Sequence, residues 1–208
     1  METEGKITKI EVQKKTDQRY SVFLNNEFAF GVSEKTFFEF RIKEGDFLKE
    51  AKIEEILLCE ELQKARGKAF GLVARKFFSE LEIRKKLQKF REEVVDDVVG
   101  ELKTLNYLDD KELAKRMIHD LSILRGVGKI KIRYELRRKG IKELVFEDLL
   151  DEMIEEKSQF EAAKKLLLKK LQTIKEVNYQ SKGKIWRFLQ SKGFENDVIS
   201  EVFEKHFG

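Results

Sequence analysis

The sequence has no proline, one cysteine and two histidines among its 208 residues. Without proline, nothing fixes φ or removes a backbone donor, so the chain favours helices. A single cysteine excludes an intrachain disulfide framework and a metal site built from several thiolates. No apolar run approaches the roughly 18 residues that a membrane span needs, and the N-terminus lacks an apolar signal stretch. We therefore expect a soluble, cytoplasmic protein with no membrane partner.

Charge is nearly balanced over the whole chain but not along it. Lys and Arg number 43 against 39 Asp and Glu, for a net charge of +4. Residues 1–60 carry 10 basic and 13 acidic side chains, whereas residues 156–208 carry 11 and 7. This surplus fits either solvated helix faces or a surface for an anionic partner.

The first 58 residues have the pattern of a small β unit. Residues 7–12 and 20–24 are rich in β-branched and aromatic side chains, as strands are. Asn25 and Asn26 tolerate positive φ and predict a tight turn into a third strand. Ser33 then predicts a helix start. Such a unit has few strands, so we expect it to pack on the next part of the chain. Three alternating residues of the third strand should share a buried face: Phe28, Phe30 and Val32.

From about residue 60 a helical theme repeats three times. Each copy has a helix, a second helix with basic residues before a leucine, a short turn and a third amphipathic helix. Aligning Leu136 with Leu189 places a Lys-Gly-apolar sequence at the same offset in both copies. A glycine there predicts a helix stop in which the next apolar residue folds back. The first copy, residues 83–90, lacks this glycine, so its turn must differ.

Capping signals support the same division. Ser79 with Glu82, Asp109 with Glu112 and Ser158 with Glu161 have capping-box spacing. We predict a mainly α fold, with three tandem three-helix repeats in an elongated array after the N-terminal β-hairpin or sheet unit. The predicted domains are residues 1–58, 59–108, 109–156 and 157–208.

Signals for catalysis, cofactors or metals fail on inspection. Residues 126–129 look like the end of a phosphate loop, but the first glycine and the final Ser or Thr are absent, so they read as an interhelical connection. His119 and His206 have no partners at ligand spacing and are expected on helix faces. Cys59 is expected to be a small buried hydrophobe. We therefore predict no catalytic, cofactor-binding or metal-binding residue, and no enzyme.

Basic residues gather in stripes on the predicted helices of the second and third repeats. Three arginines at i, i+4 and i+5 crowd one helix side, and further lysines continue the pattern in residues 164–170 and 182–192. Such stripes attract phosphate backbones or acidic protein surfaces, although a solvated face with interspersed glutamates is an equally good interpretation. The candidate contact residues are Lys129, Arg133, Arg137, Arg138, Lys164, Lys165, Lys169, Lys184 and Arg187.

These motifs, taken in order, resemble the bacterial RecX family from about residue 5 to the C-terminus. The similar segments are residues 75–87 (R-x-x-x-S-E-x-E-I-R-x-x-L), residues 106–114 (N-Y-L-D-D-x-x-L-A) and residues 125–141 (R-x-x-G-x-x-x-I-x-x-E-L-x-x-K-G-I). The opening strand and residues 28–32 resemble the β extension of longer members. Asn106 replaces the family's usual glycine, Leu113 its aromatic residue and Lys129 a frequent proline, each compatible with the same helix or turn.

The resemblance implies a non-enzymatic regulator of the RecA recombinase. RecX-like proteins bind the RecA–single-stranded DNA filament and inhibit its ATPase, coprotease and strand-exchange activities, which restrains recombination and the SOS response. The expected partners are therefore RecA and single-stranded DNA, with double-stranded DNA as a further ligand, and we expect a monomer without cofactors. The alternative is a helical module that binds DNA directly and acts without RecA.

Overall fold

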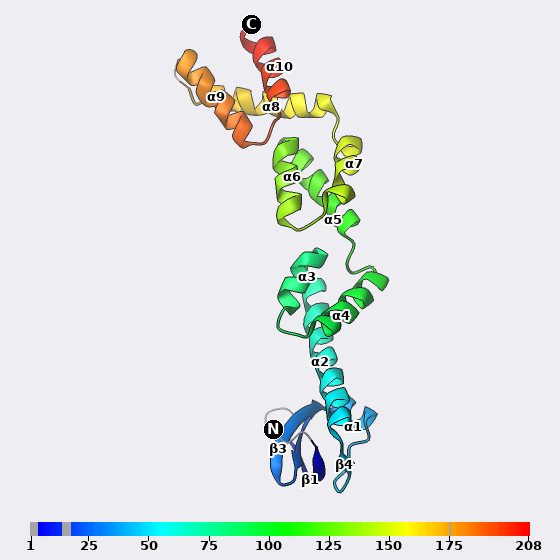
Figure 1. The fold of residues 1–208 in the computed structure, drawn as a ribbon. Helices are drawn as coiled ribbons and strands as arrows, with labels where there is room; N and C mark the ends of the chain where they lie inside the picture. Colours follow the sequence, from blue (N-terminus) through cyan, green and yellow to red (C-terminus); the bar gives the residue numbers. More distant parts are fainter. Residues whose placement is uncertain (1–3, 14–17, 175) are drawn as a thin grey trace. The chain divides into compact units, whose positions relative to one another are not determined.

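The computed structural model describes residues 4–13, 18–174 and 176–208. As predicted, the chain is mainly helical, with a small sheet at its N-terminus (Figure 1). It forms two compact units, one of Met1–Lys76 with Lys86–Leu102 and the other of Phe77–Lys85 with Lys103–Gly208. The four domain boundaries predicted from the sequence remain predictions.

The sheet is antiparallel and has four strands in the order β3-β2-β1-β4. Asn25 and Asn26, at φ values of 48° and 73°, form the predicted tight turn between the second and third strands. Two short side chains that tolerate positive φ thus set the hairpin register. The strands are β1 (Gly5–Val12), β2 (Arg19–Leu24), β3 (Glu27–Ser33) and β4 (Phe47–Leu48).

The expected buried face of β3 holds for Phe30 and Val32 but is wrong for Phe28. Phe28 is 56% exposed because it sits beside the turn, where the register with β2 shifts between Val22 and Phe23. Its ring packs edge-on against Phe23 instead, with centroids 5.8 Å apart. The local pairing irregularity therefore overrides the alternation that the sequence displays.

The β unit packs on the helix that comes after it, as predicted. Ser33 caps α1 (Glu34–Glu39), its side chain accepting a hydrogen bond from the Thr36 amide. After β4, the long helix α2 (Glu50–Val73) buries Ile53 and Ile56 against the sheet. Helical structure thus begins before residue 60, and α2 runs continuously across residues 58 and 59. A sheet this small needs a further element to cover its apolar face, and Ile53 and Ile56 of α2 help to do so.

One carboxylate is buried where α1, α2 and the sheet meet. The Glu60 side chain, 3% exposed, accepts hydrogen bonds at 2.9 Å from both the amide and the hydroxyl of Ser33. The Thr36 hydroxyl donates to the same oxygen at 3.1 Å, and the Arg19 guanidinium lies 2.7 Å from the other oxygen. Burial alone raises the pKa of Glu60, but these partners outweigh it, and the pKa is lowered overall.

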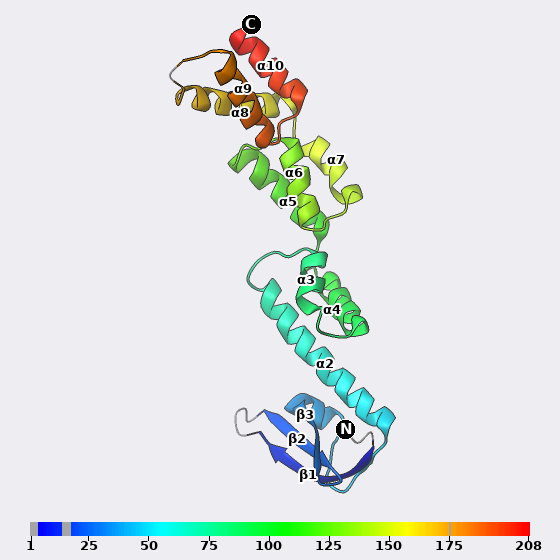
Figure 2. The ribbon, with the colours of Figure 1, turned by 60° about the vertical axis from the view of Figure 1, so that its left-hand side comes forward.

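Helix α2 lies beside α4 (Glu92–Thr104) in the first unit (Figure 2), and ion pairs link α2 to α4 and to Arg91 just before it. Arg66 lies 2.6 Å from Glu101, and the Arg91 guanidinium reaches Glu61 at 2.9 Å and Glu54 at 2.7 Å. Apolar residues of α4 are buried, among them Val98 and Leu102. The ion pairs are therefore additional to the apolar burial of α4.

The second unit begins with α3 (Glu80–Leu87), which the Ser79–Glu82 capping box starts as predicted. The Ser79 amide donates to the Glu82 carboxylate at 3.1 Å, and the Glu82 amide donates to the Ser79 hydroxyl at 3.2 Å. Asp109 also caps its helix, accepting from the amides of Lys111 and Glu112. The remaining helices are α5 (Asp110–His119), the π-helical segment η1 (Asp120–Leu124), α6 (Lys129–Arg138), α7 (Glu143–Met153), α8 (Glu156–Leu171), α9 (Tyr179–Ser191) and α10 (Asn196–Phe207).

The third predicted capping box is wrong. Helix α8 begins at Glu156, so Ser158 lies inside its first turn, and the Ser158 hydroxyl donates to the Glu155 carbonyl at 2.6 Å. Glutamates at positions 155 and 156 place negative charge at the helix start, where it interacts favourably with the helix dipole. The serine-to-glutamate spacing therefore marked the first turn of the helix and not its cap.

The Lys-Gly-apolar motifs are helix stops, as predicted. Gly140 and Gly193 take φ values of 79° and 84°. The apolar residues after them, Ile141 and Phe194, are buried and donate from their amides to the carbonyls of Leu136 and Leu189. Asn106, which replaces a glycine of the resemblance, also has positive φ, at 58°. Each position thus needs a residue that tolerates the left-handed conformation.

These turns also join one repeat to the one before it. The amides of Gly128 and Ile130, at the start of α6, donate to the carbonyls of Lys192 and Gly193, both at 3.0 Å. The earlier repeats meet similarly, because the Ser79 hydroxyl donates to the Lys139 carbonyl at 2.5 Å. Each Lys-Gly turn therefore places a carbonyl acceptor at the start of the middle helix in the preceding repeat. At α6 the donors are backbone amides that lack helical partners, and at α3 the donor is the Ser79 hydroxyl.

Candidate functional site

The basic residues predicted on α6 all have carboxylate partners within the protein. Lys129 lies 2.9 Å from Asp151, and Arg137 lies 2.6 Å from Glu143. Arg138 pairs with Glu135 of its own helix at 2.6 Å. The Lys129 ammonium holds the pKa of Asp151 below its usual range. The positive charge of this stripe is therefore largely balanced before any partner arrives.

Arg133 is the most enclosed arginine of the α6 stripe and connects three segments. Its guanidinium contacts Glu147 of α7 at 3.1 Å and Glu195, before α10, at 3.0 Å, and its side chain is 25% exposed. Burial lowers the pKa of Arg133, but the two carboxylates outweigh burial and raise it overall. This geometry ties the second repeat to the third, which gives Arg133 a structural role whatever else it contacts.

The lysines of α8 are placed differently. Lys164, Lys165 and Lys169 are exposed on one face of the helix and form no ion pair within the described ranges of the chain. Together with the partly exposed Leu168 they line a shallow depression of about 310 Å³. Lys164 also lies over the Phe160 ring, 6.0 Å from its centroid. Unpaired cations around a small apolar centre are available to an external anion.

Two lysines from outside α9 lie over Phe188, an aromatic ring of that helix. Lys170 of α8 and Lys192, just after α9, both lie over Phe188, at 5.5 Å and 5.3 Å from its centroid. Lys184 and Arg187 are exposed on α9, and within the described part of the chain the Arg187 side chain donates only to the Gly183 carbonyl of its own helix, at 3.3 Å. The third repeat thus keeps its candidate cations on the surface, whereas those of α6 are paired.

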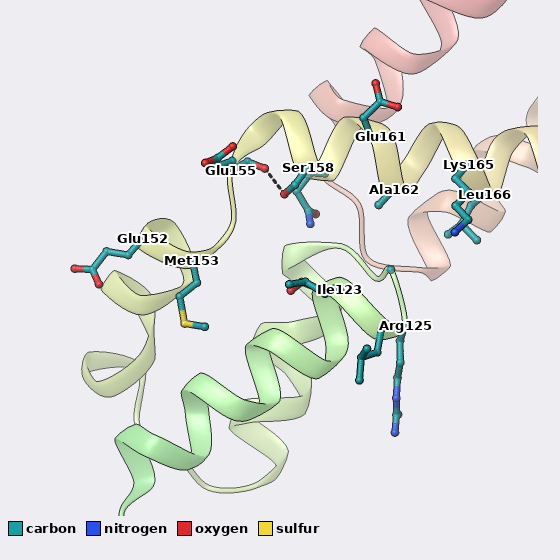
Figure 3. Close-up of a pocket in the computed structure, with 14 residues that line it drawn as sticks. Ile123, Arg125, Glu152, Met153, Glu155, Ser158, Glu161, Ala162, Lys165 and Leu166 are labelled. Atoms are coloured by element: carbon teal, nitrogen blue, oxygen red, sulfur yellow. Dashed lines mark hydrogen bonds between the residues drawn. The ribbon is translucent and has the colours of Figure 1, made fainter.

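A groove that the sequence did not indicate lies where η1 and the end of α7 face α8 (Figure 3). Its volume is about 640 Å³. Ile123 and Leu124 are 68% and 72% exposed, because η1 closes with an i→i+5 hydrogen bond from Arg125 to Asp120 and not with α-helical turns. Helical spacing would have placed Leu124 beside the buried Leu121, so the sequence pattern hides this surface.

The remaining residues discussed from the sequence, which are the 126–129 segment, the two histidines and Cys59, lie in connections or on helices. Residues 126–129 connect η1 to α6, as predicted, and His119 and His206 lie on α5 and α10. Cys59 is half-buried and not buried as expected, with its sulfur 3.8 Å from a Glu39 oxygen. Burial, and then Glu39, raises the pKa of its thiol.

The described residues contain neither a cluster of metal ligands nor a helix suited to span a membrane. In residues 4–13, 18–174 and 176–208, no group of three or more His, Cys, Asp or Glu side chains is arranged to hold a metal ion. Over the same ranges, no helix combines the length and apolarity that a bilayer span requires.

The sequence matches three family models in chain order. They are the N-terminal domain of regulatory protein RecX at residues 5–49, the second three-helix domain of RecX at residues 109–150 and its third three-helix domain at residues 157–203. A "Regulatory protein RecX" of Clostridium botulinum strain Eklund 17B is 33% identical over 206 residues, covering 97% of this chain and 96% of the relative. The chain belongs to the RecX family. A RecX of Clostridium beijerinckii is 32% identical, with 97% and 95% covered.

Solved RecX structures share the fold. A crystal structure of regulatory protein RecX matches with a TM-score of 0.69 and 30% identity, covering 96% of this chain and 98% of that one. A RecX structure from Lactobacillus salivarius matches with a TM-score of 0.65 over 71% of this chain and 97% of its own, and at 22% identity it supports the fold alone. RecX is by name a regulatory protein, and the three-helix domains matched here contain both Lys-Gly turns.

Proposed function

We propose that this chain binds RecA–single-stranded DNA filaments and inhibits the recombinase, ATPase and coprotease activities of RecA. In this role it restrains recombination, DNA repair and the SOS response as a cytoplasmic, monomeric, non-enzymatic regulator. The observation that carries the proposal is the RecX relationship over nearly the whole chain. Repeated three-helix domains also suit a partner that is itself repetitive, because several weak contacts along a filament multiply in affinity.

The test is the single-stranded-DNA-dependent ATPase of RecA with this protein titrated in. A parallel reaction contains excess double-stranded DNA as competitor. We expect inhibition in both reactions, because the filament is the target. Absence of inhibition contradicts the proposal, and inhibition that the competitor abolishes means that the protein acts by sequestering DNA.

Direct DNA binding without RecA is the second candidate function, and the α8 lysines favour it. These side chains are exposed and unpaired among the described residues, so they can meet phosphates without first breaking an ion pair. The α6 arginines would have to give up carboxylate partners to do the same. We therefore place any direct DNA contact on the third repeat.

Neutralising the α8 face should weaken DNA binding in a salt-dependent way. For Lys164→Gln, Lys165→Gln and Lys169→Gln combined, the slope of log affinity against log salt on single-stranded DNA should fall by about 2, since each phosphate contact contributes about 0.7. Fluorescence anisotropy with a labelled oligonucleotide at several salt concentrations measures this slope.

The matched control removes the same charge elsewhere. Lys85, Lys86 and Lys89 are equally exposed in and just after α3. Their combined change to glutamine lowers the net charge by the same amount and should leave the salt slope within error of the unaltered protein. Equal losses in the two triple variants would mean that total charge, and not the α8 face, governs binding.

A further inference from the structure

The groove at η1 exposes apolar side chains that the rest of its repeat would normally bury. Ile123 and Leu124 are adjacent in sequence and both point to solvent, while the hydrophobic cluster of the same repeat keeps Leu121 and Ile132 buried. Exposed aliphatic side chains gathered around one hollow are typical of a binding surface. A π-helical turn is also often found at functional sites, since it reorients side chains at some cost in regularity.

Both sides of the groove contribute to its apolar floor. Met153 comes from the end of α7, while Ala162 and Leu166 come from the side of α8 that faces Ile123 (Figure 3). The joint beneath is fixed, because the Gln159 side chain, which is buried, accepts a hydrogen bond from the Lys129 amide at 3.1 Å. This hydrogen bond links the start of α6, in the second repeat, to α8 on the other side of the groove.

The charges at the two ends of the groove are opposite. Glu161, a further charged residue of the lining, points away from the hollow (Figure 3). Glu152 and Glu155 lie at the end nearer α7, and Arg125 and Lys165 lie at the other end (Figure 3). None of these four side chains forms an ion pair with another described residue. A ligand that spans the groove should therefore carry a basic group at one end, an acidic group at the other and apolar groups between them.

We infer that this groove binds a segment of the RecA subunit in which apolar side chains lie between a basic and an acidic residue. The inference rests on the proposed function, which supplies the partner. A small molecule fits less well, because such ligands are mostly enclosed, whereas the apolar floor here is about two-thirds open to solvent at Ile123 and Leu124. A protein segment covers an open groove and leaves charged residues at its rim.

The first experiment measures binding to preformed RecA–single-stranded DNA filaments by fluorescence anisotropy of the labelled chain. The double variant Ile123→Ser, Leu124→Ser should bind filaments about tenfold more weakly, the effect of losing an apolar anchor. Its affinity for the single-stranded oligonucleotide alone should not change, since Lys164, Lys165 and Lys169 are intact. Circular dichroism and Trp186 fluorescence verify that the variant is folded.

Leu144→Ser is the matched control. Leu144 is 83% exposed on α7 and lines a different cavity. This variant removes a comparable apolar side chain from the surface of the same repeat, and filament binding should be unchanged. A loss as large as that of the groove variant would attribute the effect to surface hydrophobicity and overturn the assignment to the groove.

Charge reversal tests the groove without changing its apolar side chains. Glu152→Lys at one end and Arg125→Glu at the other should each weaken filament binding several-fold at low salt, with smaller effects at high salt.

The outcomes separate this inference from the proposed function. If the unaltered protein binds filaments and both reversals and the serine variant bind equally well, the groove is not the binding site, but the proposed function stands. If the unaltered protein does not bind filaments, the proposed function and this inference are both wrong. A concentration-dependent dimer that the serine variant abolishes in sedimentation velocity would instead assign the groove to a second copy.

Discussion

Gly193→Ala is expected to lower the free energy of unfolding of the third repeat by about 3 kcal/mol. Two costs combine at this position. A left-handed φ of 84° strains any residue with a Cβ by about 1–2 kcal/mol, and the added methyl would lie 2.3 Å from the Lys131 amide nitrogen. That backbone cannot retreat without breaking the joint to α6, and overpacking of this kind costs about 1–3 kcal/mol.

The single tryptophan makes this effect measurable locally. Trp186 packs in the core of the third repeat, edge-on to Phe203, so its fluorescence during urea unfolding reports on that repeat. Gly183→Ala in the same helix is the control, because nothing lies within 4 Å of its added methyl and its φ is helical. The free energy of unfolding of that variant should rise by about 0.5–1 kcal/mol. Similar stabilities for the two alanine variants would refute a tight joint at Gly193.

Glu60→Gln is expected to destabilise the N-terminal unit by about 3 kcal/mol at pH 7. The change leaves the Arg19 guanidinium without its anion. In either orientation of the Gln amide, its NH2 group faces groups that donate in the native structure, which are Arg19 on one side or Ser33 and Thr36 on the other. Removing one partner of a buried pair costs about 3–5 kcal/mol, and the partial exposure of Arg19 favours the lower end. Glu55→Gln, on the exposed side of α2, should change stability by less than about 0.5 kcal/mol.

The pH dependence of the Glu60 contribution comes from the lowered pKa of this residue. A carboxyl whose folded-state pKa lies below its unfolded value of about 4.3 stabilises the fold above that pH, and the contribution disappears as pH falls through the folded-state pKa. Urea unfolding followed by circular dichroism from pH 7 to pH 3 should therefore show the unaltered protein and the Gln variant converging on acidification. A constant difference between them would exclude ionised Glu60 as the source of the stability.

Local features of the fold were accessible from sequence because one or two residues determine each of them. The Asn25-Asn26 turn, the Ser33 cap and the glycine stops at 140 and 193 require side chains with particular φ tolerance or acceptors, and these can be read directly. Phe28 and Ser158 were misjudged for a related reason. A register shift in the pairing with β2 and a helix that starts three residues earlier than predicted both depend on residues outside a short sequence window.

The candidate site was harder to predict because its character depends on distant partners. The sequence showed basic stripes on both α6 and α8. It could not show that Arg133 pairs with Glu195, which is 62 residues away. It also gave no sign that η1 would turn Ile123 and Leu124 outward, since their spacing fits an ordinary helix. Charge patterns therefore located candidate cations, and only the tertiary contacts distinguished paired from available ones.

The joint at Gly128 has a consequence for the order in which the chain can mature during synthesis. A ribosome releases the second three-helix domain before Lys192 and Gly193 exist, so the first amides of α6 emerge without the carbonyls that accept their hydrogen bonds in the finished protein. Until the last helices are made, these amides must donate to water or to another acceptor instead of the two carbonyls. The nascent chain thus holds an incomplete helix start that only its own later residues can close.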